Sequence, residues 1–191
     1  MDVLMISRVL WLRRILRRIL RRREQWSEQE LREHQQRETA ALRAFASARS
    51  PFYRHFHNGL DRAPLGELPA LTKGTLMDNF DAISTDPAVR LAGLHAFLDG
   101  PQAGQRFQDK YRVFATSGSS GRKSIIPSNA AEWATIIASY GRANEWAGIT
   151  AGPAHPVRMA VVSSATAWHQ SARVAATIRS PFSVSERLDA G

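Results

Sequence analysis

Apolar residues recur every three or four positions through the first 23 residues, and arginines fill most of the gaps between them. At 3.6 residues per turn, this spacing places the apolar side chains along one stripe of a helix and the arginines on another face. Residues 1–24 are therefore predicted to be a basic amphipathic helix or an extension of the chain. The stripe consists of Val3, Ile6, Val9, Leu10, Leu12, Ile15, Leu16, Ile19 and Leu20.

A second helix is predicted from Ser27, because Ser27 and Glu30 have the spacing of a capping box. Its pattern continues to about Ala48. Ser50 is followed by Pro51, which is typical of an N-cap and the first residue of a helix, so a short helix should begin there. Gly59 is expected to end it.

Further helices are predicted in the middle of the chain, after a Pro- and Gly-rich linker over residues 61–71. One should begin at Thr72. Another should be capped by Asp86 and run from residue 88 to about residue 98, with Leu91, Leu94 and Leu98 on one face.

The pattern changes near residue 105 from helical to strand-like. Tyr111, Val113 and Ala115 alternate with Arg112 and Phe114, as in a strand, and residues 124–126 can return as the second strand of a hairpin. Ser128 is expected to cap a helix over residues 130–146, followed by a strand over 159–163 and a helix over 170–178. These elements predict an α/β fold with a helical N-terminal portion, 25–105, and a partial α/β portion, 106–191.

Composition and charge exclude several classes of function for this chain. The chain has 191 residues and no cysteine, which excludes disulfides, thiolate zinc sites and cysteine nucleophiles and fits a cytoplasmic protein. Its formal net charge is +9, of which +7 comes from eight arginines and Asp2 within residues 1–23. Because the body is nearly neutral, a basic groove for nucleic acid is not indicated.

The most informative stretch joins the two predicted strands of the hairpin. Its glycines permit a close approach of the backbone to a ligand, and successive N–H groups in such a turn can bind an anion. Hydroxyls add donors, and two cations at the exit add positive charge, a combination that suits phosphate. The candidate phosphate-binding residues are Thr116, Ser117, Gly118, Ser119, Ser120, Gly121, Arg122 and Lys123.

Two other interpretations of this loop fit the sequence less well. A flexible Ser/Gly linker is disfavoured, because the loop lies between two apolar runs and ends in Arg122 and Lys123. A Walker A loop ending at Lys123 and Ser124 would require glycine where Arg122 and Ser117 stand.

The stretch TSGSSGRK resembles the phosphate-binding signature of the adenylate-forming superfamily. The order of three segments is similar to that in its phenylacetate–CoA ligase branch: Ser50–Arg54, Leu68–Lys73 and the Ser/Gly loop. The resemblance covers about residues 45–180. It implies an α/β fold that corresponds to part of the large N-terminal domain of such an enzyme.

The resemblance implies that Thr116–Gly121 surround the β- and γ-phosphates of ATP during formation of an acyl adenylate. Mg²⁺ and CoA are implied for the complete enzyme. The chain departs from the signature at Lys123, where the family has proline, and at Ser124, where it has lysine or threonine.

Several family segments are not found in this sequence: the aromatic–Gly–x–[ST]–Glu segment, the aspartate for the ribose and the mobile C-terminal domain. We therefore expect the N-terminal portion of an AMP-forming acyl or aryl carboxylate–CoA ligase, with little or no turnover alone. No catalytic residue and no metal ligand is assigned.

His169 lies between a predicted strand and a predicted helix, where it could line the rim of a substrate site; a half-exposed surface histidine is the alternative. A different class of function also stays open. Residues 1–23 could dock a non-catalytic interaction protein on an anionic membrane or on a partner protein, which adds peripheral membrane contact to the cytoplasmic expectation.

Overall fold

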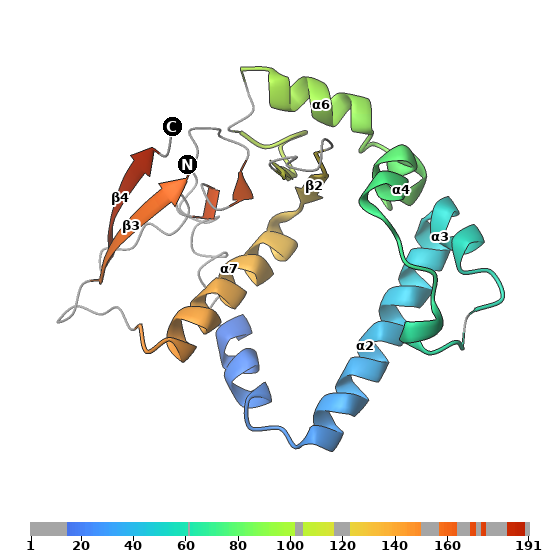
Figure 1. Cartoon of the computed structure of the whole chain (residues 1–191), viewed down its shortest axis with the longest axis horizontal. Helices are drawn as coiled ribbons and strands as arrows, with labels where there is room; N and C mark the ends of the chain where they lie inside the picture. Colours follow the sequence, from blue (N-terminus) through green and yellow to red (C-terminus); the bar gives the residue numbers. More distant parts are fainter. Residues whose placement is uncertain are drawn as a thin grey trace.

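The computed structural model describes most of the chain from residue 15 onward (Figure 1). The described residues are 15–60, 62–101, 105–116, 123–149, 157–163, 169–170, 173–174 and 183–189, and for 159, 161–163 and 183–189 only the backbone is described. Within this part the protein combines many helices with two two-stranded sheets. The broad α/β expectation agrees with this mixture.

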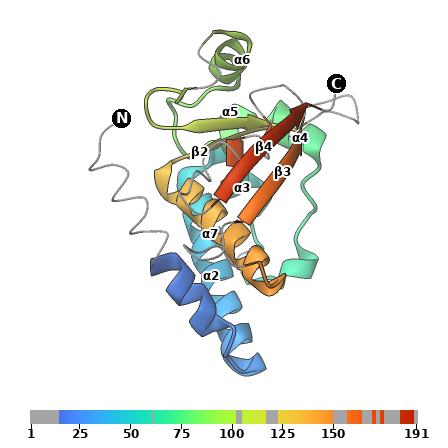
Figure 2. The same ribbon diagram turned by 90° about the vertical axis from the view of Figure 1, so that its left-hand side faces the viewer.

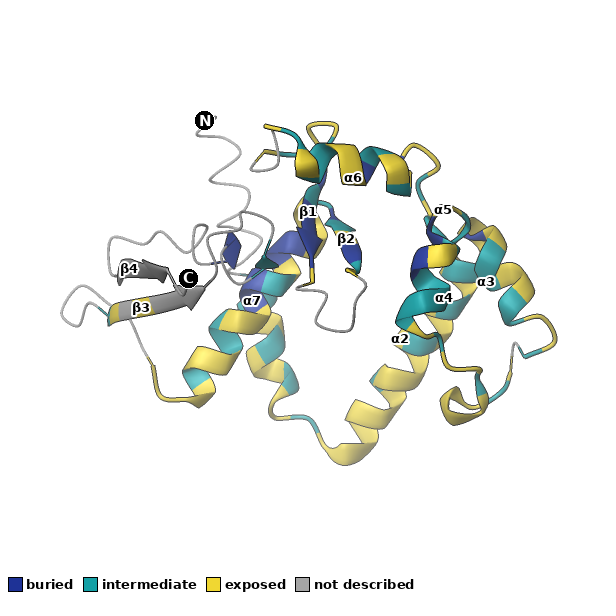
Figure 3. Ribbon diagram, turned by 45° about the horizontal axis from the view of Figure 1, so that its top comes forward, coloured by how far each residue is buried: buried dark blue, intermediate teal, exposed yellow. Residues whose placement is uncertain are grey.

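The N-terminal half is helical, and its first boundaries follow the predicted caps. An N-terminal helix over residues 15–23 precedes α2 (Glu28–Arg49). The predicted capping box is confirmed: the Ser27 backbone N–H donates to the Glu30 carboxylate at 2.7 Å, and the Glu30 N–H donates to Ser27 Oγ at 3.3 Å. No residue of α2 is buried, and Figure 3 shows its long exposed surface.

Ser50 connects three helices. It caps α3 (Pro51–Phe56), as predicted, because its Oγ accepts from the Tyr53 N–H at 3.2 Å. The same hydroxyl donates to the Ala82 carbonyl of α5 (Phe80–Ile83) at 2.8 Å, and Ser50 is completely buried. A buried hydroxyl must form such bonds to avoid a desolvation penalty, so the junction of α2 and α3 is fixed against α5.

Short elements fill the region up to the predicted strands. They are η1 (Leu65–Glu67), α4 (Lys73–Asp78), α5 and α6 (Leu91–Asp99). The helix expected to begin at Thr72 is present as α4, and Thr72 is its cap, since its side chain accepts from the Thr75 N–H. Leu94 of α6 is fully buried, and Leu91 and Leu98 pack beside it, which confirms the predicted apolar face.

The predicted hairpin is present. β1 (Arg112–Ala115) pairs antiparallel with β2 (Ile125–Ser128), with Ala115 opposite Ile125. β1 is buried on both faces, because Val113 and Ala115 belong to one hydrophobic cluster and Phe114 to another. The first cluster also contains Met77, Phe80, Val89, Leu94, Tyr111 and Ile125, and the second contains Trp133, Ile137 and Val174.

Helix α7 (Ala130–Trp146) covers the Phe114 side of the hairpin with Trp133 and Ile137. Its other end lies beside the N-terminal helix, as Figures 1 and 2 both show. The Arg21 guanidinium binds the Glu145 carboxylate with two hydrogen bonds, at 3.0 and 3.1 Å. Helix α7 therefore connects the hairpin to the N-terminal helix.

The last described element pair is parallel. β3 (Val157–Ser163) pairs with β4 (Ser183–Asp189), with Val157 opposite Ser183. Residues 170, 173 and 174 between them are helical, consistent with the crossover that parallel strands require. β3 confirms the strand predicted over 159–163. β4 was not predicted, because SVSERLD is mostly polar.

Two of the predicted helix caps are wrong, and one predicted helix is divided in two. Asp86 does not cap α6, which begins three residues after residue 88 at Leu91; the Asp81 carboxylate accepts from the Leu91 N–H at 2.8 Å. Ser128 does not cap α7, because it is the last residue of β2. Asn129 does so instead, with a capping box to Glu132. The helix from Thr72 is divided at Asn79 into α4 and α5.

No helix among the described residues combines the length and apolarity that crossing a bilayer requires.

The burial of Leu94 predicts a large loss of stability in Leu94→Ala. Truncating a fully buried leucine removes apolar contacts and leaves a cavity, so the free energy of unfolding should fall by about 2–5 kcal/mol. Urea unfolding followed by far-UV circular dichroism measures this change. Leu65→Ala is the matched control, because Leu65 is 68% exposed. Equal losses in the two variants would contradict the proposed core.

Candidate functional site

The ends of the Ser/Gly loop are joined at the top of the hairpin. The Thr116 N–H donates to the Ser124 carbonyl at 3.0 Å, and the Ser124 N–H donates to Thr116 Oγ1 at 2.9 Å. The first bond extends the backbone pairing by one step beyond Ala115 and Ile125, and the second adds a side-chain contact at the same position. Thr116 and Ser124 are therefore paired with each other at the end of the two hairpin strands.

The structure places only the first and last of the predicted phosphate-binding residues. Thr116 and Lys123 are both exposed, one at each end of the loop. The other six lie outside the described residues: Ser117, Gly118, Ser119, Ser120, Gly121 and Arg122. The phosphate-binding arrangement itself thus stays a prediction.

Aromatic and guanidinium groups alternate beneath the hairpin, on the side of β1 that faces α7. The rings of Phe114 and Trp133 are stacked with centroids 5.2 Å apart. The Arg112 guanidinium lies 5.3 Å from the centre of the Trp133 ring, and the Arg173 guanidinium lies 6.0 Å from that of Phe114. Cation–π attraction of this kind strengthens where the cation is shielded from water.

These arginines are unusual for their burial. Arg173 is 7% exposed and Arg112 is half-buried. Burial lowers the pKa of Arg112, and repulsion from Arg106 and Arg173 lowers it further; burial alone lowers the pKa of Arg173. Both guanidinium groups stay charged at neutral pH, because arginine does not lose its proton in proteins. The side of the hairpin that faces α7 is therefore positively charged.

Asp86 holds the start of β1 to the helical region. Its carboxylate accepts from Lys110 Nζ at 2.8 Å, from the Tyr111 hydroxyl at 2.6 Å and from the Ala88 N–H at 3.0 Å. Lys110 also lies over the Tyr111 ring, 4.7 Å from its centre. The bond from Lys110, followed by those from Tyr111 and Ala88, lowers the pKa of Asp86 to about 2.

Sequence reasoning missed the roles of Asp86, Arg112 and Arg173. The sequence predicts Asp86 as a helix cap, because Asp-Pro is a common helix start. The one available signal for Arg112 was its place two residues before Phe114, which puts both side chains on one face of the strand. The place of Arg173 depends on the packing of its neighbour Val174 against Phe114 of β1, which no local pattern reveals.

His169, the predicted rim residue, is half-buried at the start of the helical turn that contains Arg173. Its backbone carbonyl accepts from the Arg173 N–H at 3.1 Å. Residues 164–168 lie outside the described part of the chain, so a substrate rim around His169 also stays a prediction.

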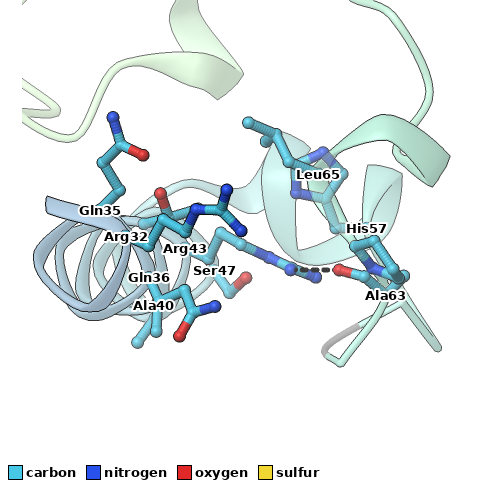
Figure 4. A pocket seen from close by; sticks show the side chains of 12 residues that line it. Arg32, Gln35, Gln36, Ala40, Arg43, Ser47, His57, Ala63 and Leu65 are labelled. Carbon is cyan, nitrogen blue, oxygen red and sulfur yellow. Dashed lines mark hydrogen bonds between the residues drawn. The ribbon is translucent and has the colours of Figure 1, made fainter. Parts of the chain in front are cut away.

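A separate cavity of about 470 Å³ lies between α2 and residues 57–65 (Figure 4). Arg43 reaches across it, donates to the Ala63 carbonyl at 2.7 Å and also bonds the Leu60 carbonyl. These bonds attach the segment after α3 to α2. The cavity contains none of the predicted phosphate-binding residues.

Among the residues described, no group of three or more His, Asp or Glu side chains could hold a metal ion.

No protein-family model, no curated protein and no solved structure matches this chain.

The Asp86 network predicts a stability component that depends on pH. The folded-state pKa of about 2 lies below the ordinary value of 3.8, so the stabilisation is complete above pH 3.8. It should disappear as the pH falls from 3.8 toward 2, where the folded protein must also protonate Asp86. Urea unfolding at a series of pH values should show that the stability difference between wild type and Asp86→Asn shrinks over this window.

Glu67→Gln is the control for this series, because Glu67 is an exposed carboxylate in η1. Its difference from wild type should change much less over the same window. A difference between wild type and Asp86→Asn that stays constant down to pH 2 would refute the network.

Proposed function

We propose that this chain provides the nucleotide-phosphate-binding part of an ATP-dependent, AMP-forming carboxylate–CoA ligase. The observation that carries the proposal is the hairpin closed by Thr116 and Ser124, with the sequence Ser-Gly-Ser-Ser-Gly-Arg between its strands. A closed hairpin brings the backbone N–H groups and hydroxyls of such a loop into one small region, as the binding of several phosphate oxygens requires.

The contacts among the three segments of the family resemblance support the proposal. Ser50, in the first segment, bonds the Ala82 carbonyl in α5, the helix that also contains Phe80. Thr72, in the second, caps the helix that contains Met77. Met77 and Phe80 share a hydrophobic cluster with Val113 and Ile125 of the hairpin. The segments are thus connected through one core, as parts of one functional unit would be.

Positive charge near the hairpin also favours a phosphate ligand. Lys123 stands at the exit of the loop, and Arg112 and Arg173 lie beneath the strands. A triphosphate is strongly anionic, and charged donors bind its oxygens with short, strong hydrogen bonds. Fixed backbone donors would position the phosphates, and the cations would offset their charge.

In the complete reaction, a carboxylate oxygen of the acid attacks the α-phosphorus of ATP, and pyrophosphate leaves. The thiolate of CoA then attacks the carbonyl carbon of the acyl adenylate, and AMP leaves. Thr116–Lys123 would hold the β- and γ-phosphates during the first step, while His169 is the candidate for contact with the acid. Mg²⁺ would add charge neutralisation on the phosphates.

Residues 1–191 are expected to bind ATP weakly, with a Kd on the order of millimolar, and to form no acyl adenylate. Binding should broaden the β- and γ-phosphate signals of ATP in ³¹P NMR. Ser119→Ala/Ser120→Ala should reduce the broadening, because two hydroxyl donors are lost. The matched control is Ser47→Ala/Ser139→Ala, on α2 and α7, which should behave like wild type.

Equal broadening by the two double variants would refute the assignment of phosphate binding to this loop. Rapid adenylate formation with a carboxylic acid would instead refute the expectation that the chain does not turn over alone.

A further inference from the structure

The N-terminal helix contacts α7 through its charged edge. Arg17 and Arg21, one turn apart, both bind the Glu145 carboxylate. Glu24 continues the same edge and accepts from Arg142 Nε at 2.9 Å and Trp146 Nε1 at 3.0 Å. This edge of the helix is thus attached to the end of α7 by two ion-pair clusters. In the first cluster the N-terminal segment supplies the cations, and in the second it supplies the anion.

The opposite side of the same helix differs in character. Ile15, Arg18, Ile19 and Arg22 are spaced i, i+3, i+4 and i+7, so they form one face, which we call the outer face. Arg18 and Arg22 are exposed, and Ile19 is 38% exposed. Neither hydrophobic cluster of the described chain includes a residue of this helix.

Ile15, Leu16 and Leu20 of the apolar stripe are half-buried, and Ile19 is the one described residue of the stripe that is exposed. The apolar stripe normally faces the protein core because its burial supplies most of the stabilisation. Here Ile19 and two guanidinium groups instead face outward together. This combination matches a helix at a membrane interface, where isoleucines enter the acyl region and arginines contact lipid phosphates.

We propose that the outer face of the N-terminal helix binds the surface of an anionic lipid bilayer, while Arg17, Arg21 and Glu24 keep the helix attached to α7. Charge complementarity selects this occupant, since residues 1–23 carry +7 and the remaining residues carry +2. The exposed Ile19 between Arg18 and Arg22 favours a bilayer over nucleic acid, because a phosphate backbone offers no apolar phase.

Sedimentation with vesicles tests the proposal on the full chain. The wild type should pellet with vesicles of equimolar phosphatidylcholine and phosphatidylglycerol, and binding should fall as salt is added. It should not pellet with phosphatidylcholine alone. Arg18→Gln/Arg22→Gln should bind the anionic vesicles about tenfold or more weakly, because each arginine near the surface contributes to the attraction.

The matched control is Arg37→Gln/Arg62→Gln, which removes the same charge from exposed positions elsewhere. It should bind like wild type. Equal binding by the two double variants, or equal pelleting of the wild type with neutral and anionic vesicles, would overturn the proposal. So would an absence of pelleting combined with binding of duplex DNA that depends on Arg18 and Arg22.

A fluorescent probe tests insertion independently of charge. The chain contains no cysteine, so Ile19→Cys can be labelled at one site with an environment-sensitive dye. Its emission should rise and shift to the blue with anionic vesicles, whereas dye at Leu65→Cys, an exposed leucine near α3, should not respond. An unchanged signal at position 19 while the protein pellets would show adsorption without insertion and overturn the interfacial placement.

Discussion

The burial of β1 on both of its faces is the constraint on which the rest of this structure depends. Successive side chains of a strand point to opposite sides, so Val113 and Phe114 enter two different hydrophobic clusters. Helices α4–α6 pack on one side, and α7 and Val174 pack on the other. A shift of the strand by one residue would move the side chains of each face to the opposite face. Arg112 would then enter the hydrophobic cluster that contains Val113 in this structure. The position of the loop between Thr116 and Ser124 follows from this register.

The structure places charged groups next to this apolar strand and stabilises them in two ways. Arg112 and Arg173 lie against the stacked rings of Trp133 and Phe114, where the aromatic faces offset part of the cost of burying a cation. Asp86 accepts three hydrogen bonds from groups at the start of the strand and just after itself. The contacts with aromatic rings keep Arg112 and Arg173 near the hairpin. The hydrogen bonds of Asp86 join the helical region to β1.

Local patterns predicted the parts of the structure that depend on neighbours in sequence. The capping box at Ser27, the cap at Ser50 and the hairpin strands each need only a few consecutive residues, and each is found. The partners of Asp86, the packing of Arg173 and the pairing of β4 with β3 connect residues far apart in the chain. No periodicity contains that information. Asp86 is the clearest example. A carboxylate before proline is typical of a helix cap, but Asp86 instead accepts hydrogen bonds from Lys110 and Tyr111, which are more than twenty residues away in the sequence.

Helix α7 relates the two proposed sites to each other. Trp133, near its start, packs against the hairpin, and Glu145, near its end, binds the N-terminal helix. At a rise of about 1.5 Å per residue, these two points are about 18 Å apart along one continuous helix. If residues 15–23 lie on a bilayer, the ion pairs with α7 would keep the hairpin at a fixed distance from the bilayer surface. A carboxylic acid that partitions into the bilayer would then be concentrated near the proposed phosphate-binding loop, which would give the basic helix a role in the proposed reaction.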